Sequence, residues 1–251
     1  MKFVTFNIRY DCGHDGENNF EFRKPLILDT LREERPDIVC FQEVLPHVLA
    51  WLKASLPEYT VVGCGRGRQL DSEAAAIAFR TADWNLMQLD TYWLSPTPRV
   101  PGSRYAEQSD CPRVTTEALL NPVGTARALR VANTHLDHEG VRARELGLGQ
   151  ILRHIDAAEL FPDAPAVVTG DFNALPDSPE MAVFDRFPGY VNATRDIGRT
   201  YHGFMRATGS CIDHIWLRGG IECVKVEKWR HQRGGVYLSD HYPVCATLQW
   251  R

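Results

Sequence analysis

The stretch "APAVVTGDFNALP" (Ala164–Pro176) joins an apolar run directly to an acid, an amide and a proline. Its first half is rich in residues that favour an extended chain, which predicts a buried strand. The glycine, acid and amide that follow are typical of a turn at the strand's exit. Asp171 and Asn173 could also hold a metal and a water there. Because residues two apart on an extended strand point the same way, we expect these two side chains to share one face.

Strands and helices alternate on both sides of this stretch. The patterns predict strands at residues 2–9, 37–44, 60–65, 74–80, 84–94, 116–121, 128–136, 164–172, 211–218, 222–231 and 243–250. They predict helices within 18–36 and at 45–57, 141–159 and about 179–186. Many strands are consecutive, which indicates antiparallel pairing within mixed sheets, and the bracketing helices favour a layered α/β sandwich. No internal repeat or linker interrupts the chain, so we expect a single domain over residues 1–251.

The composition narrows the class of protein. The net charge of −4 argues against a protein that grips long nucleic acid through a basic face. A local basic pocket remains compatible with that charge, and its candidates are Arg9, Arg23, Arg66, Arg68 and Arg113. The apolar runs are too short to cross a bilayer, and the N-terminal segment reads as a first strand, not as a signal peptide. Seven scattered cysteines fit reduced thiols, so we expect a cytoplasmic protein.

Residues that carry chemistry recur at the ends of the predicted strands. They are Asn7, Glu43, His135, Asp171, Asn173, Asp213, Asp240 and His241. Taken one at a time, each also fits a turn, a capping group or a surface ion pair. Taken together they form a coherent set, because carboxylate and amide oxygens suit Mg²⁺ or Mn²⁺ and an acid-held histidine can donate to a phosphate. Strand ends of this kind can converge on one rim of a sheet sandwich.

The order of the motifs is more specific than any single one. "FNIR", "FQEV", "NTHLDH", "GDFNALP", "IDHIWL" and "SDHYPV" follow one another along the chain. This order resembles the endonuclease/exonuclease/phosphatase superfamily of metal-dependent phosphoesterases, over nearly the whole length from Lys2 to Trp250. The resemblance implies a four-layer α/β sandwich of the DNase I-like kind, made of two mixed sheets flanked by helices. It also implies hydrolysis of a phosphoester by in-line attack of water.

The resemblance assigns three residues to a metal site for Mg²⁺ or Mn²⁺. Glu43 corresponds to the principal ligand and Asn7 lies beside it. Asp240 corresponds to an acid that assists the metal. The metal neutralises charge on the phosphoryl oxygens in this chemistry, and no covalent enzyme intermediate is required.

Five further residues take catalytic roles by the same resemblance. Asp171 and Asn173 orient and deprotonate the attacking water. His241 contacts the scissile phosphate, and Asp213 holds its other ring nitrogen, which fixes the tautomer. His135 faces the non-bridging phosphate oxygens.

Three residues outside these motifs are predicted to contact the substrate: Arg113, His202 and Arg9. Glu73 is a further candidate for the lining of the cleft. The substrate itself stays open, because the machinery of this superfamily serves nucleic acids, lipids and sugar phosphates alike. The acidic composition favours a small or terminal phosphoester, and nuclease action on DNA or RNA is the alternative. No protein partner is implied.

Two other functions compete with this interpretation. "NTHLDH" resembles the zinc pattern of metallo-β-lactamase-like hydrolases at His135, Asp137 and His138, but Asn133 stands where that pattern needs a histidine. A non-catalytic binding module should have lost some of the metal-binding and water-positioning acids, and none is missing here. The sequence therefore predicts a metal-dependent phosphoesterase.

Overall fold

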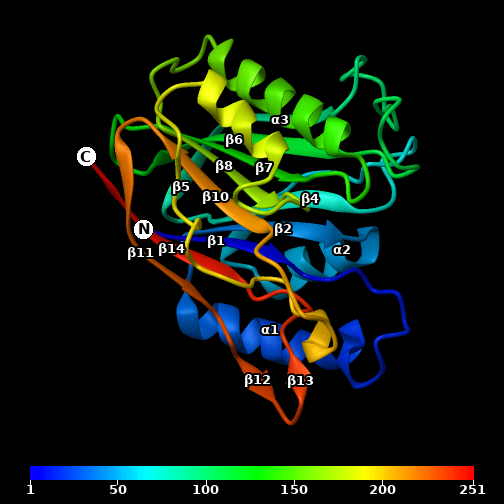
Figure 1. Cartoon of the computed structure of the whole chain (residues 1–251). Helices are drawn as coiled ribbons and strands as arrows, with labels where there is room; N and C mark the ends of the chain where they lie inside the picture. The colour runs from blue at the N-terminus through cyan, green and yellow to red at the C-terminus, as the bar shows by residue number, and fades with distance from the viewer.

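The structure, a computed structural model, describes residues 1–251 and contains two six-stranded β-sheets packed face to face (Figure 1). The first sheet has the order β11-β14-β1-β2-β4-β3 and the second the order β5-β6-β7-β8-β10-β9. The first consists of β1 (Lys2–Asn7), β2 (Ile38–Val44), β3 (Tyr59–Val62), β4 (Ala74–Arg80), β11 (Ile221–Lys228) and β14 (Val244–Trp250). The second consists of β5 (Trp84–Trp93), β6 (Val114–Pro122), β7 (Leu129–His135), β8 (Ala166–Asp171), β9 (Val191–Asn192) and β10 (Asp213–Arg218). A small hairpin joins β12 (Gln232–Arg233) to β13 (Val236–Tyr237).

Helices cover the outer face of each sheet. Figure 1 shows α1 (Phe20–Glu34) and α2 (Pro46–Ser55) below the first sheet and α3 (Val141–Asp156) above the second. The segment Pro179–Arg186, predicted as a helix, is a 3₁₀ helix beside α3. The molecule is thus the expected four-layer α/β sandwich of the DNase I-like kind.

Both sheets are mixed, as the sequence predicts. β1 runs parallel to β2 and β7 runs parallel to β8, while the other pairs within these sheets are antiparallel. Parallel neighbours need a crossover, and here α1 and α3 supply the two crossovers. No helix in the structure combines the length and the apolar composition that a bilayer crossing needs.

The alternation of side chains along the central strands explains where a site can form. In β1, Phe3 faces the layer between the sheets and Val4 faces the helices. In β8, Val167 faces the layer between the sheets and Val168 faces α3. Every second residue of a strand faces the same side. Asn7, four residues after Phe3, and Asp171, four residues after Val167, therefore also face the layer between the sheets. The layer between the sheets is therefore apolar over most of its length and polar at one end.

Candidate active site

Polar ends of strands from both sheets meet across the inner layer. The side chain of Asn7, at the end of β1, donates through Nδ2 to Asp171 Oδ2 over 3.0 Å, although the two residues are 164 positions apart. The same nitrogen donates to Glu43 Oε1 over 2.9 Å. Asn7 and Asp171 are buried. A single amide thus ties the first sheet to the second at the point where the apolar layer ends.

Glu43 reaches this point because β2 is irregular. Its register against β4 shifts between Phe41 and Val44, and Glu43 itself has φ 62°. Left-handed backbone is strained for a residue with a side chain, and a bulge of this kind re-aims the side chain it carries. In a regular strand Glu43 would point away from the side that Gln42 occupies. The bulge instead brings its carboxylate to Asn7 and to the backbone N–H of Tyr10, which donates to Oε2 over 2.7 Å.

Close approach of two strands places Asp171. Gly170 has φ 138°, and a Cβ at this position would lie 1.8 Å from the carbonyl oxygen of Thr134 in β7. Only glycine fits here, and the following carboxylate therefore sits against the end of β7. The "GD" of the motif is a packing requirement as well as a chemical one.

Asn173 does not follow the strand alternation that we expected for it. β8 ends at Asp171, and Asn173 adopts φ 50° in the turn beyond it. Its backbone N–H donates to Asp171 Oδ1 over 2.9 Å, and its Nδ2 donates to the carbonyl oxygen of Leu136 over 3.0 Å. The two side chains still line the same cavity, but a left-handed turn, and not a shared strand face, brings them together.

A buried acid–histidine pair lies beside Asp171. Asp213 Oδ2 is 2.8 Å from His241 Nδ1, and His241 Nε2 is 3.7 Å from Asp171 Oδ2. Burial by itself lowers the pKa of His241, but Asp213, together with Asp171 and Asp240, outweighs it and raises the pKa to about 10. Burial raises the pKa of Asp171 to about 7, against the opposing charge of His241. A charged imidazole therefore stands next to a carboxylate that holds a proton unusually well.

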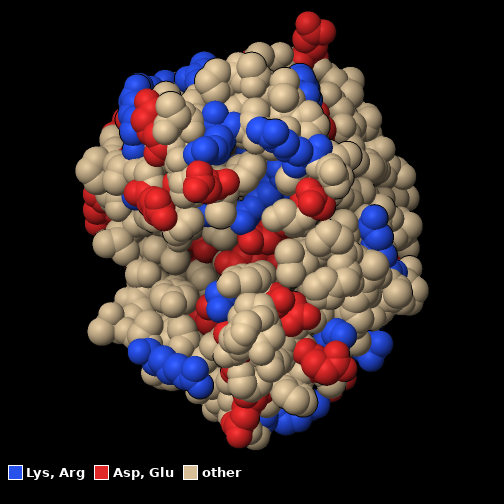
Figure 2. Space-filling model, turned by 90° about the vertical axis from the view of Figure 1, so that its right-hand side faces the viewer, with Lys and Arg blue, Asp and Glu red and all other residues tan.

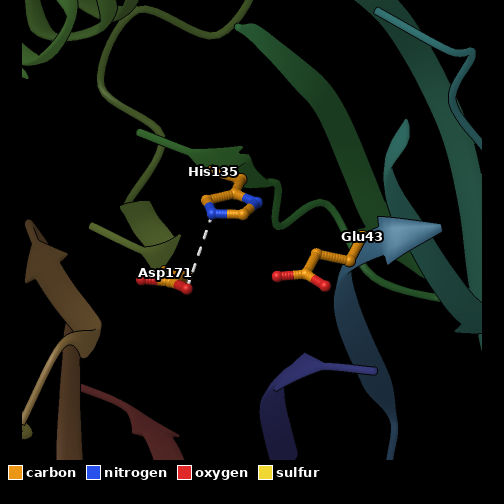
Figure 3. A group of neighbouring side chains, drawn as sticks. All are labelled: Glu43, His135 and Asp171. Atoms are coloured by element: carbon orange, nitrogen blue, oxygen red, sulfur yellow. Dashed lines mark ion pairs between the residues drawn. The ribbon is translucent and has the colours of Figure 1, made fainter. Parts of the chain in front are cut away.

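A second group of side chains could hold a metal ion. Figure 3 shows Glu43, His135 and Asp171 turned toward one another, and one ligand atom from each lies within 4.8 Å of the others. Burial, together with Arg113 and Arg66, lowers the pKa of His135 well below its usual value, so its ring is neutral. Its Nε2 lies 3.6 Å from Asp171 Oδ2. Two carboxylates and a neutral imidazole fit a divalent cation.

The predicted metal ligands overlap this group only at Glu43. The amide oxygen of Asn7 accepts the backbone N–H of Arg9 over 2.9 Å, which turns the amide hydrogens toward the carboxylates. In this orientation Asn7 holds the acids together. Asp240 lies at the same cavity, with Ser239 Oγ 3.1 Å from Oδ1 and Arg9 Nε 3.7 Å from Oδ2. Burial raises the pKa of Asp240. Ligation by Asn7 and Asp240 remains a prediction.

These groups, except Asn7 and Asp213, line one cavity of about 650 Å³. Figure 2 shows the hollow with acidic side chains gathered at its centre and basic side chains bordering it. Its lining includes Arg9, Tyr10, Glu43, Arg66, Glu73, Cys111, Arg113, His135, His138, Asp171, Asn173, Tyr201, Asp240 and His241. Tyr10, Tyr201 and Cys111 were not predicted, and the only signal for them was their closeness in sequence to Arg9, His202 and Arg113.

Three of the predicted basic or substrate-binding residues lie elsewhere. His202 is fully buried and does not line the cavity; its ring packs against Tyr242, with centroids 4.2 Å apart. Arg23 is also fully buried, and its guanidinium donates to backbone carbonyls that include those of Asn18 and Leu238. Arg68 is exposed outside the cavity. Arg9, Arg66 and Arg113 are the arginines of the lining.

The zinc pattern is not assembled by the structure. Asp137 accepts hydrogen bonds from Ser109 and from the backbone N–H groups of Glu139 and Gly140, so its carboxylate is committed to holding the chain before α3. His138 is half exposed, and its Nδ1 lies 3.0 Å from Arg113 Nη2. Ligand atoms of His135, Asp137 and His138 do not gather around one point.

Comparison with known proteins agrees with this geometry. Residues 4–241 match the Endonuclease/Exonuclease/phosphatase family. An endonuclease/exonuclease/phosphatase from Bacteroides vulgatus is 30% identical with a TM-score of 0.93, and the match covers 100% of this chain and 98% of that one. A mannosyl-6-phosphatase of Bacteroides thetaiotaomicron is 25% identical with a TM-score of 0.89, and the match covers 100% of both chains. No curated protein matches the sequence.

A more distant similarity concerns the fold alone. TDP2 of D. rerio, solved with a single-strand DNA product, shares 18% identity and a TM-score of 0.76, over 99% of this chain and 98% of that one. The family match and the 30% identical relative carry more weight, because both extend over nearly all of the residues that build the two sheets and the cavity. The chain therefore belongs to the endonuclease/exonuclease/phosphatase family, whose members are phosphoester hydrolases.

Proposed function

We propose that this phosphoester hydrolase requires Mg²⁺ or Mn²⁺ and cleaves a small or terminal phosphoester with an activated water. The observation that carries the proposal is the convergence of two groups on one carboxylate. Asp171 belongs both to the group with Glu43 and His135 and to the group with Asp213 and His241. A residue shared in this way lies where a metal-bound phosphoryl group and an attacking water would meet.

The residues divide the chemistry as follows. A bound divalent cation would neutralise charge on the phosphoryl oxygens, held by Glu43 with His135 and Asp171. Asp171 belongs to both groups and accepts the proton of the attacking water. Asn173 Oδ1 makes no hydrogen bond within the protein and accepts the other hydrogen of that water.

His241 is placed to donate a hydrogen bond to the phosphoryl group. Its Nδ1 faces Asp213 Oδ2 at 2.8 Å, which leaves Nε2 to donate to a non-bridging oxygen. The nearby carboxylates raise its pKa to about 10 despite burial, so the ring is charged at neutral pH. A cation that is already in place stabilises charge in the transition state without reorganisation.

The size and lining of the cavity favour a small substrate. About 650 Å³ lies in the range of pockets that enclose a small molecule. The net charge of −4 argues against a protein that grips a long nucleic acid backbone. The 25% identical structure is that of a mannosyl-6-phosphatase, which supports a phosphomonoester of a sugar as the substrate class here.

The proposal is tested with a substrate panel and matched variants. Purified protein, with Mg²⁺, Mn²⁺ or EDTA, is assayed on bis-p-nitrophenyl phosphate, sugar monophosphates, single-stranded oligonucleotides and phospholipids. Asp171→Asn should lower kcat by about 10²- to 10⁴-fold, the range for loss of a general base. Asp177→Asn removes an exposed acid of the same segment and should leave kcat unchanged.

Three outcomes would contradict the proposal. They are hydrolysis of no member of the panel, full activity in Asp171→Asn, and activity that only Zn²⁺ restores after EDTA. Preferred cleavage of oligonucleotides would support the nuclease alternative instead of a small phosphoester.

A further inference from the structure

Arg113, at the start of β6, carries hydrogen-bond donors that nothing in the protein uses. Its side chain is 4% exposed and lines the cavity. Nε and Nη1 are buried and have no acceptor, and Nη2 lies 3.0 Å from His138 Nδ1. A buried guanidinium with unpaired N–H groups is costly unless an acceptor is supplied.

The nearby acids do not supply that acceptor. Asp137 Oδ2 is 3.8 Å from Arg113 Nε, too long for a hydrogen bond, and this carboxylate already accepts from Ser109 and from two backbone amides of the following turn. Glu73 Oε1 is paired with Arg66 Nη2 at 2.7 Å. Arg113 forms an ion pair with Asp137, but it is the one arginine of the cavity lining that donates no hydrogen bond to a carboxylate.

Arg113 lies near His135, whose two ring nitrogens face different groups. His135 Nε2 is 3.6 Å from Asp171 Oδ2, whereas its Nδ1 is 3.9 Å from Glu73 Oε2, the acid that pairs with Arg66. The imidazole of His135 therefore lies between Asp171 and Glu73, the partner of Arg66. Arg113 and Arg66 are close enough to this ring to repel its proton. A phosphoryl group seated at Asp171 and His241 leaves the Arg113 donors for another part of the same ligand.

We propose that Arg113 forms a subsite for a second anionic group of the substrate, a phosphate or a carboxylate, next to the scissile phosphoester. The claim that this anionic group belongs to a substrate rests on the proposed function. The claim that Arg113 binds an anion does not. The planar fork of an arginine suits a group with two or more acceptor oxygens. The preferred substrate is then a small molecule that carries a second anionic group in addition to the scissile phosphate, and not one whose only charged group is that phosphate.

A binding measurement tests the subsite without turnover. In EDTA the carboxylates around Asp171 repel anions, and the Arg113 variants show whether inorganic phosphate that still binds does so at this arginine. Addition of the wild-type protein should broaden the ³¹P signal of phosphate. Phosphate should also raise the melting temperature of the wild-type protein relative to chloride at equal ionic strength. Arg113→Gln should abolish both effects and Arg113→Lys should weaken them, while Arg68→Gln, which removes an exposed arginine, should behave as wild type. Absence of binding to the wild type, an adventitious response that persists in Arg113→Gln, or loss in Arg68→Gln would each overturn the proposal.

Kinetics then test the substrate class. With Mg²⁺, glucose 1,6-bisphosphate and 6-phosphogluconate are compared with glucose 6-phosphate, so that a second phosphate and a carboxylate are examined separately. Arg113→Gln should lower kcat/KM at least about 10-fold for whichever bis-anionic compound is preferred and less than about 3-fold for glucose 6-phosphate. An equal loss on all three, or no preference in the wild type, would overturn the second-anion subsite. Failure of these three compounds and of the whole substrate panel to react would contradict the proposed function, and the phosphate measurement would still decide the subsite.

Discussion

Replacing His202 with phenylalanine should prevent part of the loss of stability that the wild-type protein undergoes between pH 6.5 and pH 4. The imidazole is fully buried against Tyr242 and Tyr237, and neither ring nitrogen has a hydrogen-bond partner. Burial, with His241 nearby, lowers its pKa from 6.5 to about 4. Phenylalanine fills similar space and leaves no donor or acceptor behind, so the substitution itself costs little.

The sign and size of the effect follow from proton linkage. Above pH 6.5 the ring is neutral in both the folded and the unfolded chain, and the histidine costs nothing. As the pH falls below 6.5 the unfolded chain takes up a proton that the folded chain refuses until about pH 4. At about 1.4 kcal/mol for each pKa unit, the loss accumulates to about 2 to 3 kcal/mol at pH 4.

Urea unfolding in EDTA at a series of pH values measures this difference. The free energy of unfolding of His202→Phe should match the wild type above pH 7 and exceed it by about 2 to 3 kcal/mol near pH 4. The exposed His14, replaced by phenylalanine, should follow the wild-type curve. Parallel curves for His202→Phe and the wild type would refute the assignment of a buried neutral ring. Because His202 does not line the cavity, kcat/KM of His202→Phe should stay within about 3-fold, whereas a substrate contact would require a larger loss.

Two further predictions concern the backbone and the metal. Gly170→Ala should lower the free energy of unfolding by more than about 3 kcal/mol, because the new Cβ would overlap the carbonyl of Thr134 at a φ of 138°. Gly124→Ala, at φ 77° with open space around it, should cost only about 1 kcal/mol, and equal losses in urea unfolding would contradict the steric argument. Glu43→Gln should weaken Mg²⁺ binding, measured by calorimetry, at least about 10-fold, with Glu58→Gln as the exposed control. Unchanged affinity in Glu43→Gln would exclude this carboxylate as a ligand.

Much of the fold was predictable because its signals are local. The helices at 18–36, 45–57 and 141–159 and the eleven predicted strands all occur, since apolar periodicity and turn residues act over a few positions. The two-residue strands β9, β12 and β13 were not predicted, because two residues are too few to show an alternation of apolar and polar side chains. The segment 179–186 has the predicted periodicity but forms a 3₁₀ helix.

The candidate site was predictable residue by residue but not in its geometry. Motif order placed Asp171, Asp213 and His241 together, and the structure brings them within hydrogen-bond or ion-pair distance. Arg23 was predicted as a candidate for a basic pocket, and His202, which precedes the Asp213 strand, as a substrate contact. Residue type does not report burial, and both side chains lie inside the protein.

The sequence by itself determined the layered architecture, the reaction class and the acids, amides and histidines that strand ends offer. Only the tertiary structure decided how they face one another. The bulge that turns Glu43 inward, the left-handed turn at Asn173 and the His135 ring between Asp171 and Arg66 all depend on contacts between strands distant in sequence. Side-chain direction within a regular strand follows from a period of two, but at a bulge or a strand end it is set by what the opposite sheet allows.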